Sequence, residues 1–137
     1  MLPNVPELNV AVLAAASIGV LTVLMNPAYQ LVEIEYMLKK TSVKGLIMLD
    51  NLKTLNHYDI LCKICPELEK SKKGELTAKS LPDLKHVILV KNKLVASSVD
   101  KYKGVWFFEE VEKFNSQLKA FPLVDFDDNF ILMFTVK

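Results

Sequence analysis

The chain has 137 residues, which is enough for one domain with a hydrophobic core, and 51% of them are apolar. Its 17 basic and 16 acidic residues leave a formal net charge of +1, so composition offers no basic surface for nucleic acid. All 17 basic residues are lysine, and without arginine a phosphate group can be bound only by lysine or by backbone amides. We expect one domain with no nucleic-acid partner.

The first part of the chain predicts a helix and a strand. Asn4 and Glu7 have the spacing of a helix start, Pro6 suits a first turn, and Gly19 is placed to end the helix. Residues 20–25 are rich in β-branched side chains and predict a strand. The uncharged stretch 10–25 is shorter than the roughly 20 residues that a bilayer core requires. We expect a buried helix followed by a buried strand, with no membrane span.

The pattern then repeats. Residues 30–40 predict an amphipathic helix with acids early and lysines late, and residues 44–49 predict a short apolar strand. A third helix is expected over residues 52–65, ended by Pro66. Residues 67–83 are polar and without periodicity, which indicates a surface loop.

The second half continues with a strand over residues 86–90 and a second polar loop over about 91–103. Residues 106–118 predict a helix with Trp106, Phe107 and Phe114 available to the core, and residues 130–135 predict a buried last strand.

Helices alternating with short apolar strands favour an α/β fold, in which a mostly parallel sheet is covered by helices on both faces. A doubly wound domain commonly starts with a strand, whereas this chain starts in a loop before a helix and ends just after a strand. We therefore expect residues 1–137 to form a partial sheet, with an open edge and exposed apolar helix faces, within an incomplete domain.

Cys62 and Cys65 have a spacing found in zinc and redox sites, and His57 lies nearby. A second ligand pair is missing, and the cysteines lie near a helix C-terminus, where the helix dipole disfavours thiolate. We interpret them as two ordinary thiols of a reducing compartment.

Three further groups are also interpreted as structural. Asp125, Asp127 and Asp128 lack the regular spacing and the glycine of a calcium loop. His86 has no nucleophile or acid arranged around it, and residues 106–108 are aromatic but precede glutamates that would repel phosphate. Four glycines are too few for a glycine-rich phosphate loop. We assign no catalytic residue and no metal site.

Seven segments together resemble a known family. They are Met1-Leu2-Pro3-Asn4, residues 11–16, Asn26-Pro27-Ala28-Tyr29-Gln30, residues 33–40, Lys44-Gly45-Leu46-Ile47, Ile64-Cys65-Pro66-Glu67 and residues 81–88. Their order and spacing resemble the AMP-forming acyl-CoA synthetases of the adenylate-forming superfamily, and in particular its medium-chain fatty-acid–CoA ligases of the acyl-CoA synthetase family member 2 type. The resemblance runs from Leu2 to Thr135 and implies a fragment of the large N-terminal domain.

In that family the strand equivalent to residues 131–135 leads into a Ser/Thr/Gly-rich loop that wraps the phosphates of ATP. Thr135 matches the first position of the loop, and Val136 departs where serine is expected. The resemblance therefore implies Thr135 as the one cofactor-binding candidate, at the start of a truncated phosphate loop.

For the intact enzyme the resemblance implies ATP, Mg²⁺ and coenzyme A as cofactors, a fatty acid as substrate and a mitochondrial location. The chain itself has no targeting segment, which otherwise indicates the cytoplasm. Because no catalytic role of the family falls on a residue of this chain, we expect it to be inactive alone and to bind these cofactors poorly.

Two alternatives remain open. The chain could be a free-standing α/β module that binds a small molecule or a protein through Asn26-Pro27-Ala28 and Asp50-Asn51, at the expected carboxyl ends of two strands. It could also be a membrane-associated peptide that uses residues 10–25.

Overall fold

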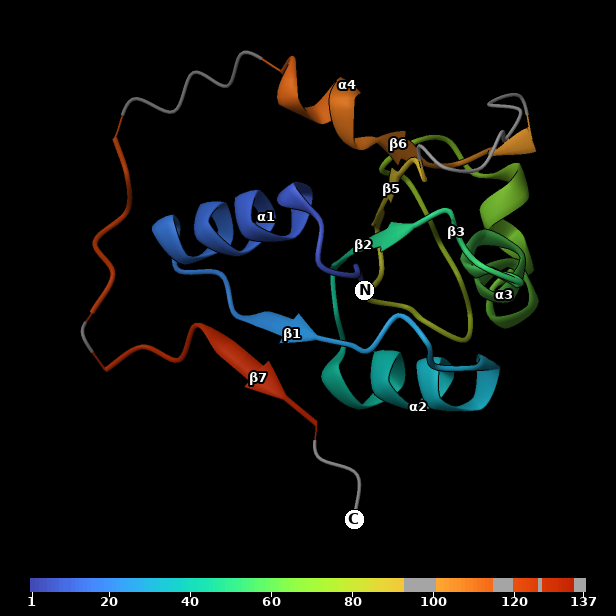
Figure 1. The fold of residues 1–137 in the computed structure, drawn as a ribbon, viewed down its shortest axis with the longest axis horizontal. Coiled ribbons are helices and arrows are strands. Elements are labelled where there is room, and N and C mark those ends of the chain that lie inside the picture. The colour runs from blue at the N-terminus through green and yellow to red at the C-terminus, as the bar shows by residue number, and fades with distance from the viewer. Residues whose placement is uncertain (93–100, 115–119, 126, 135–137) are drawn as a thin grey trace.

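The computed structural model describes residues 1–92, 101–114, 120–125 and 127–134 (Figure 1). The elements within them, in chain order, are α1 (Pro6–Ser17), β1 (Thr22–Leu24), α2 (Leu31–Thr41), β2 (Gly45–Leu49), β3 (Asn51–Leu52), β4 (Leu55–Asn56), α3 (His57–Ile64), the 3-10 helix η1 (Pro66–Lys70), β5 (His86–Val90), β6 (Trp106–Phe107), α4 (Phe108–Glu112) and β7 (Ile131–Met133).

The strands form two parallel sheets and one hairpin. β2, β5 and β6 lie side by side in the order β2-β5-β6, with Leu46 opposite Val87 in the central pair. β1 pairs with β7, with Val23 opposite Leu132, so the last strand returns to the first part of the chain (Figure 1). β3 and β4 pair in antiparallel fashion. The expected α/β fold with a mostly parallel sheet is confirmed.

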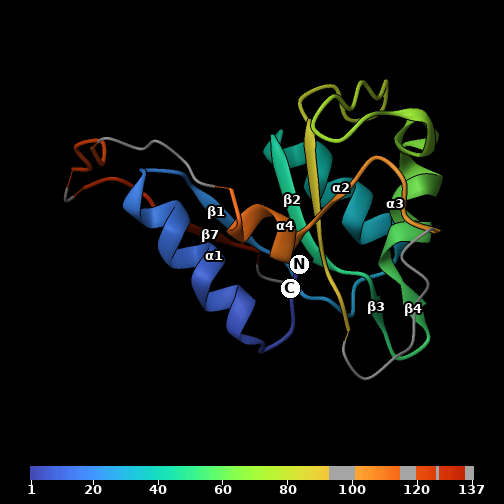
Figure 2. The ribbon, with the colours of Figure 1, turned by 90° about the horizontal axis from the view of Figure 1, so that it is seen from above.

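The central pair β2 and β5 separates two apolar layers. One layer takes Leu46, Met48, Val87 and Leu89, and the other takes Ile47, Leu49, Ile88 and Val90. The helices α2 and α3 complete the first layer, whereas α1 and α4 contribute to the second. Figure 2 shows α2 and α3 on one side of β2 and β5, with α1 on the other. Helices therefore cover both faces of this sheet, as expected.

The helix α2 shows why the sequence pattern was reliable there. The backbone N–H of Gln30 donates to Glu33 Oε2 over 3.2 Å in a capping box, and Lys39 pairs with Glu35 one turn earlier over 2.6 Å. The helix ends at Thr41, and its C-cap Ser42 has a left-handed φ of 48°. The expected bounds 30–40 differ from the observed ones by a single residue at each end.

The expected helix over residues 52–65 was wrong in its first half. Residues 51–56 form the β3–β4 hairpin, with Lys53 at φ 53° in the turn, and α3 begins only at His57. The side chain of Asn56 accepts the N–H of Asp59 over 3.0 Å and so caps the helix. The leucines of the hairpin, Leu52 and Leu55, are three positions apart, which also fits the apolar face of a helix.

Two further expectations need correction. The segment 67–83 is not merely a surface loop, because it buries Leu68, Leu76, Ala78 and Leu81 in the core. The helix expected over residues 106–118 is a strand, β6, followed by the short α4. Phe114 is 63% exposed instead of buried, and residues 115–118 lie outside the described residues.

The first helix and the last strand were expected to be buried, but both are largely exposed. None of the residues of α1 is buried, and Leu13 is 67% exposed. In β7, Leu132 and Met133 are 38% and 69% exposed. Among the described residues, the β1–β7 sheet therefore lacks the apolar cover that both faces of β2 and β5 have. The apolar helix face and the exposed strand match the expectation for a partial sheet.

Gly104 provides a test of the packing between η1 and the segment before β6. Its φ is +71°, and an added Cβ would lie 2.2 Å from the carbonyl oxygen of Leu68. We expect Gly104→Ala to lower the free energy of unfolding by about 2–4 kcal/mol, through left-handed strain and overpacking. At Gly45 an added Cβ meets nothing closer than 3.9 Å, so Gly45→Ala is the matched control and should be neutral or slightly stabilising. Urea unfolding measures both, and equal effects would contradict the described contact.

Candidate functional site: a buried polar junction

The carboxyl ends of β2 and β5 are the place where an α/β sheet usually binds its ligand. Here they carry a group of polar residues that we call the polar junction: Asp50, Asn51, His57, Asn92 and Tyr102. Asp50 is completely buried and His57 is 1% exposed, which is unusual for such side chains. The burial of these groups requires that their hydrogen bonds be made within the protein.

Asp50 joins the two strand ends. Its Oδ1 accepts the backbone N–H of Asn51 over 2.8 Å and that of Asn92 over 2.9 Å, and Tyr102 donates its hydroxyl to Oδ2 over 3.4 Å. The backbone N–H of Asp50 also donates to the carbonyl of Val90. The amide of Asn92 donates to the carbonyl of Asn51 over 3.2 Å. The junction thus locks the residues after β2 to those after β5.

His57 ties a third segment to the junction. Its Nδ1 lies 3.0 Å from the carbonyl oxygen of Leu49, and its Nε2 lies 2.7 Å from that of Pro27. Its backbone N–H donates to the carbonyl of Asp50 over 3.0 Å. A neutral imidazole has one N–H, so it donates to one of the two carbonyls, and both contacts are hydrogen bonds only in a doubly protonated ring. His57 therefore holds the turn after β1 against the end of β2.

An aromatic cluster continues the junction toward β6. Tyr102 packs edge-on against Tyr58 and Phe107, with ring centroids 5.1 and 6.3 Å apart. The hydroxyl of Tyr58 donates to the carbonyl of Lys103 and accepts its N–H, each over 3.1 Å. Burial raises the pKa of Tyr58 to about 12. The Nζ of Lys91 lies 4.4 Å from the ring centroid of Phe107.

The two loops that the sequence singled out for a binding module do meet in space. His57 contacts Pro27 in the first and the backbone of Asp50 in the second. Their polar groups, however, are used in hydrogen bonds to the backbone, which fixes the loops relative to one another. The arrangement suits a scaffold that positions strand ends.

The two cysteines lie in and directly after α3. Cys65 is fully buried, and its thiol donates to the carbonyl of Leu61 over 3.2 Å. Burial raises the pKa of Cys65 to about 12 and also raises the pKa of Cys62. Because both thiols are held protonated, neither is an activated nucleophile. The ring of His57 faces two carbonyls and is not available as a partner for them.

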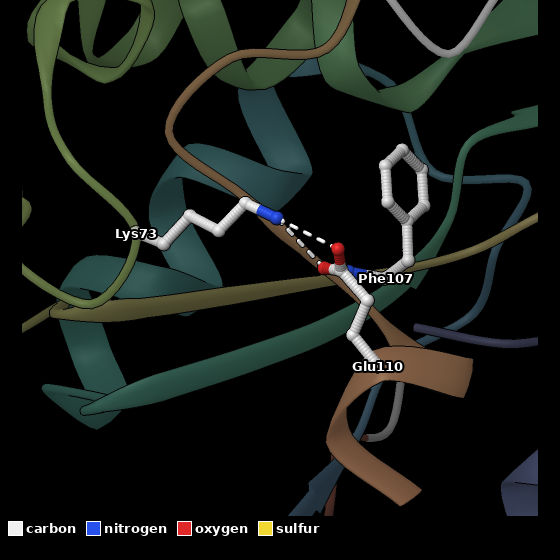
Figure 3. A network of polar contacts seen from close by, with 3 residues as sticks. All are labelled: Lys73, Phe107 and Glu110. Carbon is white, nitrogen blue, oxygen red and sulfur yellow. Dashed lines mark hydrogen bonds and ion pairs between the residues drawn. The ribbon is translucent and has the colours of Figure 1, made fainter. Parts of the chain in front are cut away.

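A second polar network lies at the start of α4 (Figure 3). Lys73 Nζ lies 2.9 and 2.8 Å from the two carboxylate oxygens of Glu110, and the N–H of Phe107 donates to Glu110 Oε2 over 3.0 Å. The hydrogen bond from Lys73, followed by that from Phe107, lowers the pKa of Glu110. Lys73 also lies 5.3 Å from the ring centroid of Trp106. This network anchors β6 and α4 to the segment before β5.

The remaining sequence candidates show no assembled site. Asp125 and Asp128 bond to each other, with the N–H of Asp125 donating to Asp128 Oδ2 over 2.9 Å, as in a self-contained turn. His86 is exposed at the start of β5. Thr135, the cofactor-binding candidate, lies outside the described residues, directly after the end of the described chain at residue 134.

Within residues 1–92, 101–114, 120–125 and 127–134, no three side chains of His, Cys, Asp or Glu gather in a way that could hold a metal ion. In the same ranges no helix has both the length and the apolar character needed to cross a membrane. α1 is only 12 residues long and ends at Ser17, before the uncharged stretch of the sequence does.

Sequence reasoning missed most of the junction. Asp50 and Asn51 were named as a loop after a strand, but neither Asn92 nor Tyr102 was connected with them. These residues lie 41 to 52 positions apart, and the pairing of β5 with β2 and with β6 brings them together. The position of Asp50 directly after an apolar strand was the sequence signal for a polar group at this strand end.

Comparison with known proteins identifies the class. The model of the AMP-binding enzyme family matches residues 1–136, and the chain belongs to this family. The parallel α/β arrangement fits a part of its AMP-binding domain.

Among similar proteins are mitochondrial medium-chain acyl-CoA ligases named ACSF2. The chain is 49% identical to that of Mus musculus and 46% identical to that of Homo sapiens, each over 78 residues. Each alignment covers 57% of this chain and 13% of the relative. The protein of the same name from Danio rerio is 35% identical over 88 residues, or 64% of this chain and 14% of that protein. The alignments thus cover only a small fraction of these relatives.

Asp50→Asn tests the polar junction. The substitution keeps the shape of the side chain but replaces a charged acceptor of two backbone N–H groups, so we expect a loss of about 2 kcal/mol in the free energy of unfolding. Asp59→Asn is the matched control, because Asp59 forms an ion pair with Lys101 in which both side chains are nearly half exposed, and it should cost less than about 1 kcal/mol. Similar losses for the two variants would argue against the role of Asp50.

Glu110→Gln tests the network of Figure 3 through its pH dependence. Because folding lowers the pKa of Glu110 below its ordinary 4.5, its contribution is present above pH 4.5 and is lost as pH falls through the folded-state pKa. The difference in stability between the original chain and Glu110→Gln should be at most about 1 kcal/mol at pH 7, since both side chains of the pair are more than one-third exposed. It should shrink at pH 3 in chemical unfolding, whereas Glu109→Gln should show little effect at either pH.

Proposed function

We propose that this chain is a supporting part of an AMP-forming fatty-acid–CoA ligase, and that it does not carry out the reaction alone. The observation that carries the proposal is the parallel pairing of β7 with β1, which directs the chain from Met133 toward Thr135 at a strand carboxyl end. In an α/β sheet a phosphate-binding loop belongs at that position. The family match over residues 1–136 supports this placement.

The reaction of the whole enzyme has two steps. The carboxylate of a fatty acid attacks the α-phosphorus of ATP and releases pyrophosphate, which gives an acyl-adenylate. The thiol of coenzyme A then attacks the acyl carbon, and AMP leaves. Mg²⁺ supplies charge neutralisation for the phosphates in the first step. Within this scheme we assign to Thr135 the start of the phosphate-binding loop.

The residues of the polar junction have a structural role in this proposal, because they hold strand ends in position. The polar junction fixes the ends of β2 and β5, and His57 fixes the turn after β1, which is the strand that pairs with β7. A rigid base for β7 would hold the following loop in place, as positioning of phosphates demands. We propose that this chain contributes the support and that other parts of a longer enzyme contribute the catalytic groups.

The names of the relatives support two finer proposals. The mammalian proteins are medium-chain ligases, so we propose a medium-chain fatty acid as the substrate of the enzyme to which this chain belongs. Their names also place them in mitochondria, and we propose the same location here.

An assay tests whether the chain is inactive alone. The 137-residue chain is incubated with ATP, Mg²⁺, coenzyme A and octanoate, and pyrophosphate release is measured. We expect release equal to that of a heat-treated sample. Reproducible turnover above this control would overturn the proposal of a purely supporting part.

A chimera tests whether the chain belongs to a ligase. The matching segment of the Mus musculus enzyme is replaced by that of this chain, and formation of octanoyl-CoA is followed. We expect the chimera to retain activity within about tenfold of the parent, because a scaffold that is 49% identical over the matched segment should preserve the fold. A folded chimera, with normal melting behaviour but no activity, would contradict the proposal.

A further inference from the structure

An apolar cavity of about 590 Å³ lies between the two parallel sheets. The strand β1 and the residues before it border one side, and residues 43–47 at the start of β2 border the other. α1 contributes Leu8 and Ala11 to its lining. β1 and β2 are not paired with each other, although each is paired on its other edge. The cavity therefore separates two strands whose facing edges have no strand partner among the described residues.

Met1 shows how a strand enters this space. Its amino group donates to the carbonyl of Ile47 over 2.5 Å, and its carbonyl accepts the N–H of Leu49 over 3.2 Å. One residue that donates to position 47 and accepts from position 49 is the pattern of a parallel ladder, with Met1 opposite Met48. Figure 1 shows the N-terminus in the middle of the molecule, beside β2. Met1 thus occupies the place of the last residue of a parallel strand.

The direction of this ladder points into the cavity. In a parallel pair, residues before Met1 would lie beside residues 47, 46 and 45 in turn. Those residues of β2 line the cavity. Because alternate residues of a strand direct their backbone groups to the same edge, the N–H of Ile47 and the C=O of Gly45 face the same edge as the two groups that Met1 uses.

Both sides of the cavity require apolar side chains. Met1 packs in the same layer as Met48, and Leu2 packs in the same layer as Leu49. A strand continuing upstream would alternate between these two layers, toward Leu46 on one side and Ile47 on the other. A strand buried on both faces is apolar at every position. The occupant is therefore a short extended apolar segment, of which three residues would lie beside Gly45, Leu46 and Ile47 of β2.

Two polar groups at the cavity, the amino group of Met1 and the hydroxyl of Thr22, are buried in unfavourable surroundings when no such segment is present. Burial lowers the pKa of the Met1 amino group to about 5, whereas a peptide N–H would make the same bond without an ionisable group. The hydroxyl oxygen of Thr22, which also belongs to a lining residue, is buried without a hydrogen-bond partner among the described residues.

We propose that the cavity is a docking slot for an apolar β-strand joined to the amino group of Met1, which runs parallel to β2 and connects the two sheets in the order β7-β1-slot-β2-β5-β6. The alignment covers 13% of the Mus musculus relative, so most of that protein lies outside the matched segment. The proposal concerns the sheet alone and does not depend on ligase activity.

The test adds residues before Met1. One form carries Met-Val-Ile-Val-Ile, a second carries Met-Gly-Ser-Gly-Ser, and a third carries Met-Val-Pro-Val-Pro, which is apolar but lacks the N–H groups of a ladder. We expect the first form alone to raise Tm by at least about 5 °C, the scale of a modest gain in a domain of this size. Hydrogen exchange of the Ile47 amide should slow by at least about tenfold in that form only.

Each other outcome counts against the proposal. Equal Tm and equal Ile47 exchange in the first and second forms would show that no strand docks. Equal stabilisation by the proline form would indicate burial without a ladder. Aggregation of the first form, with the second remaining monomeric, would show that the segment stays exposed. Stabilisation by free acetyl-Val-Ile-Val-Ile-amide but not by the joined segment, or only with dimer formation, would assign the slot to a separate chain.

Discussion

The parallel pairing of β2 with β5 is the interaction on which the rest of the structure depends. It divides the core into two layers, because alternate side chains of both strands point to opposite faces. It also brings residues after position 49 beside those after position 90, which creates the polar junction. Loss of this pairing would separate the two apolar layers and remove the hydrogen bond from the Asn92 N–H to the buried Asp50 carboxylate.

Much of this architecture was predictable because the signals were local. The capping residues and the apolar face of α2 predicted this helix, and short apolar runs predicted β2 and β5. The hairpin of residues 51–56 was missed because its leucines also fit a helical period, and its turn depends on the left-handed Lys53. The burial expected for α1 and β7 was wrong. Apolar side chains favour burial, but whether they are buried depends on which neighbouring segments pack against them.

The candidate site was less accessible to sequence reasoning. Asp50 could be noticed as an acid after a strand, but its partners Asn92 and Tyr102 are linked to it only through the sheet. The family, in contrast, was recognisable from short segments of consecutive residues, such as Asn26-Pro27-Ala28-Tyr29, which can be read without knowing any long-range pairing. The structure gives one of them a physical role, since the carbonyl of Pro27 meets the ring of His57.

The protonated state of the cysteines has a consequence for oxidative stress. Peroxide oxidises thiolates far faster than thiols, and the buried Cys65, with a pKa of about 12, contains almost no thiolate at neutral pH. Peroxide would therefore spare Cys65 and act first on more acidic thiols elsewhere.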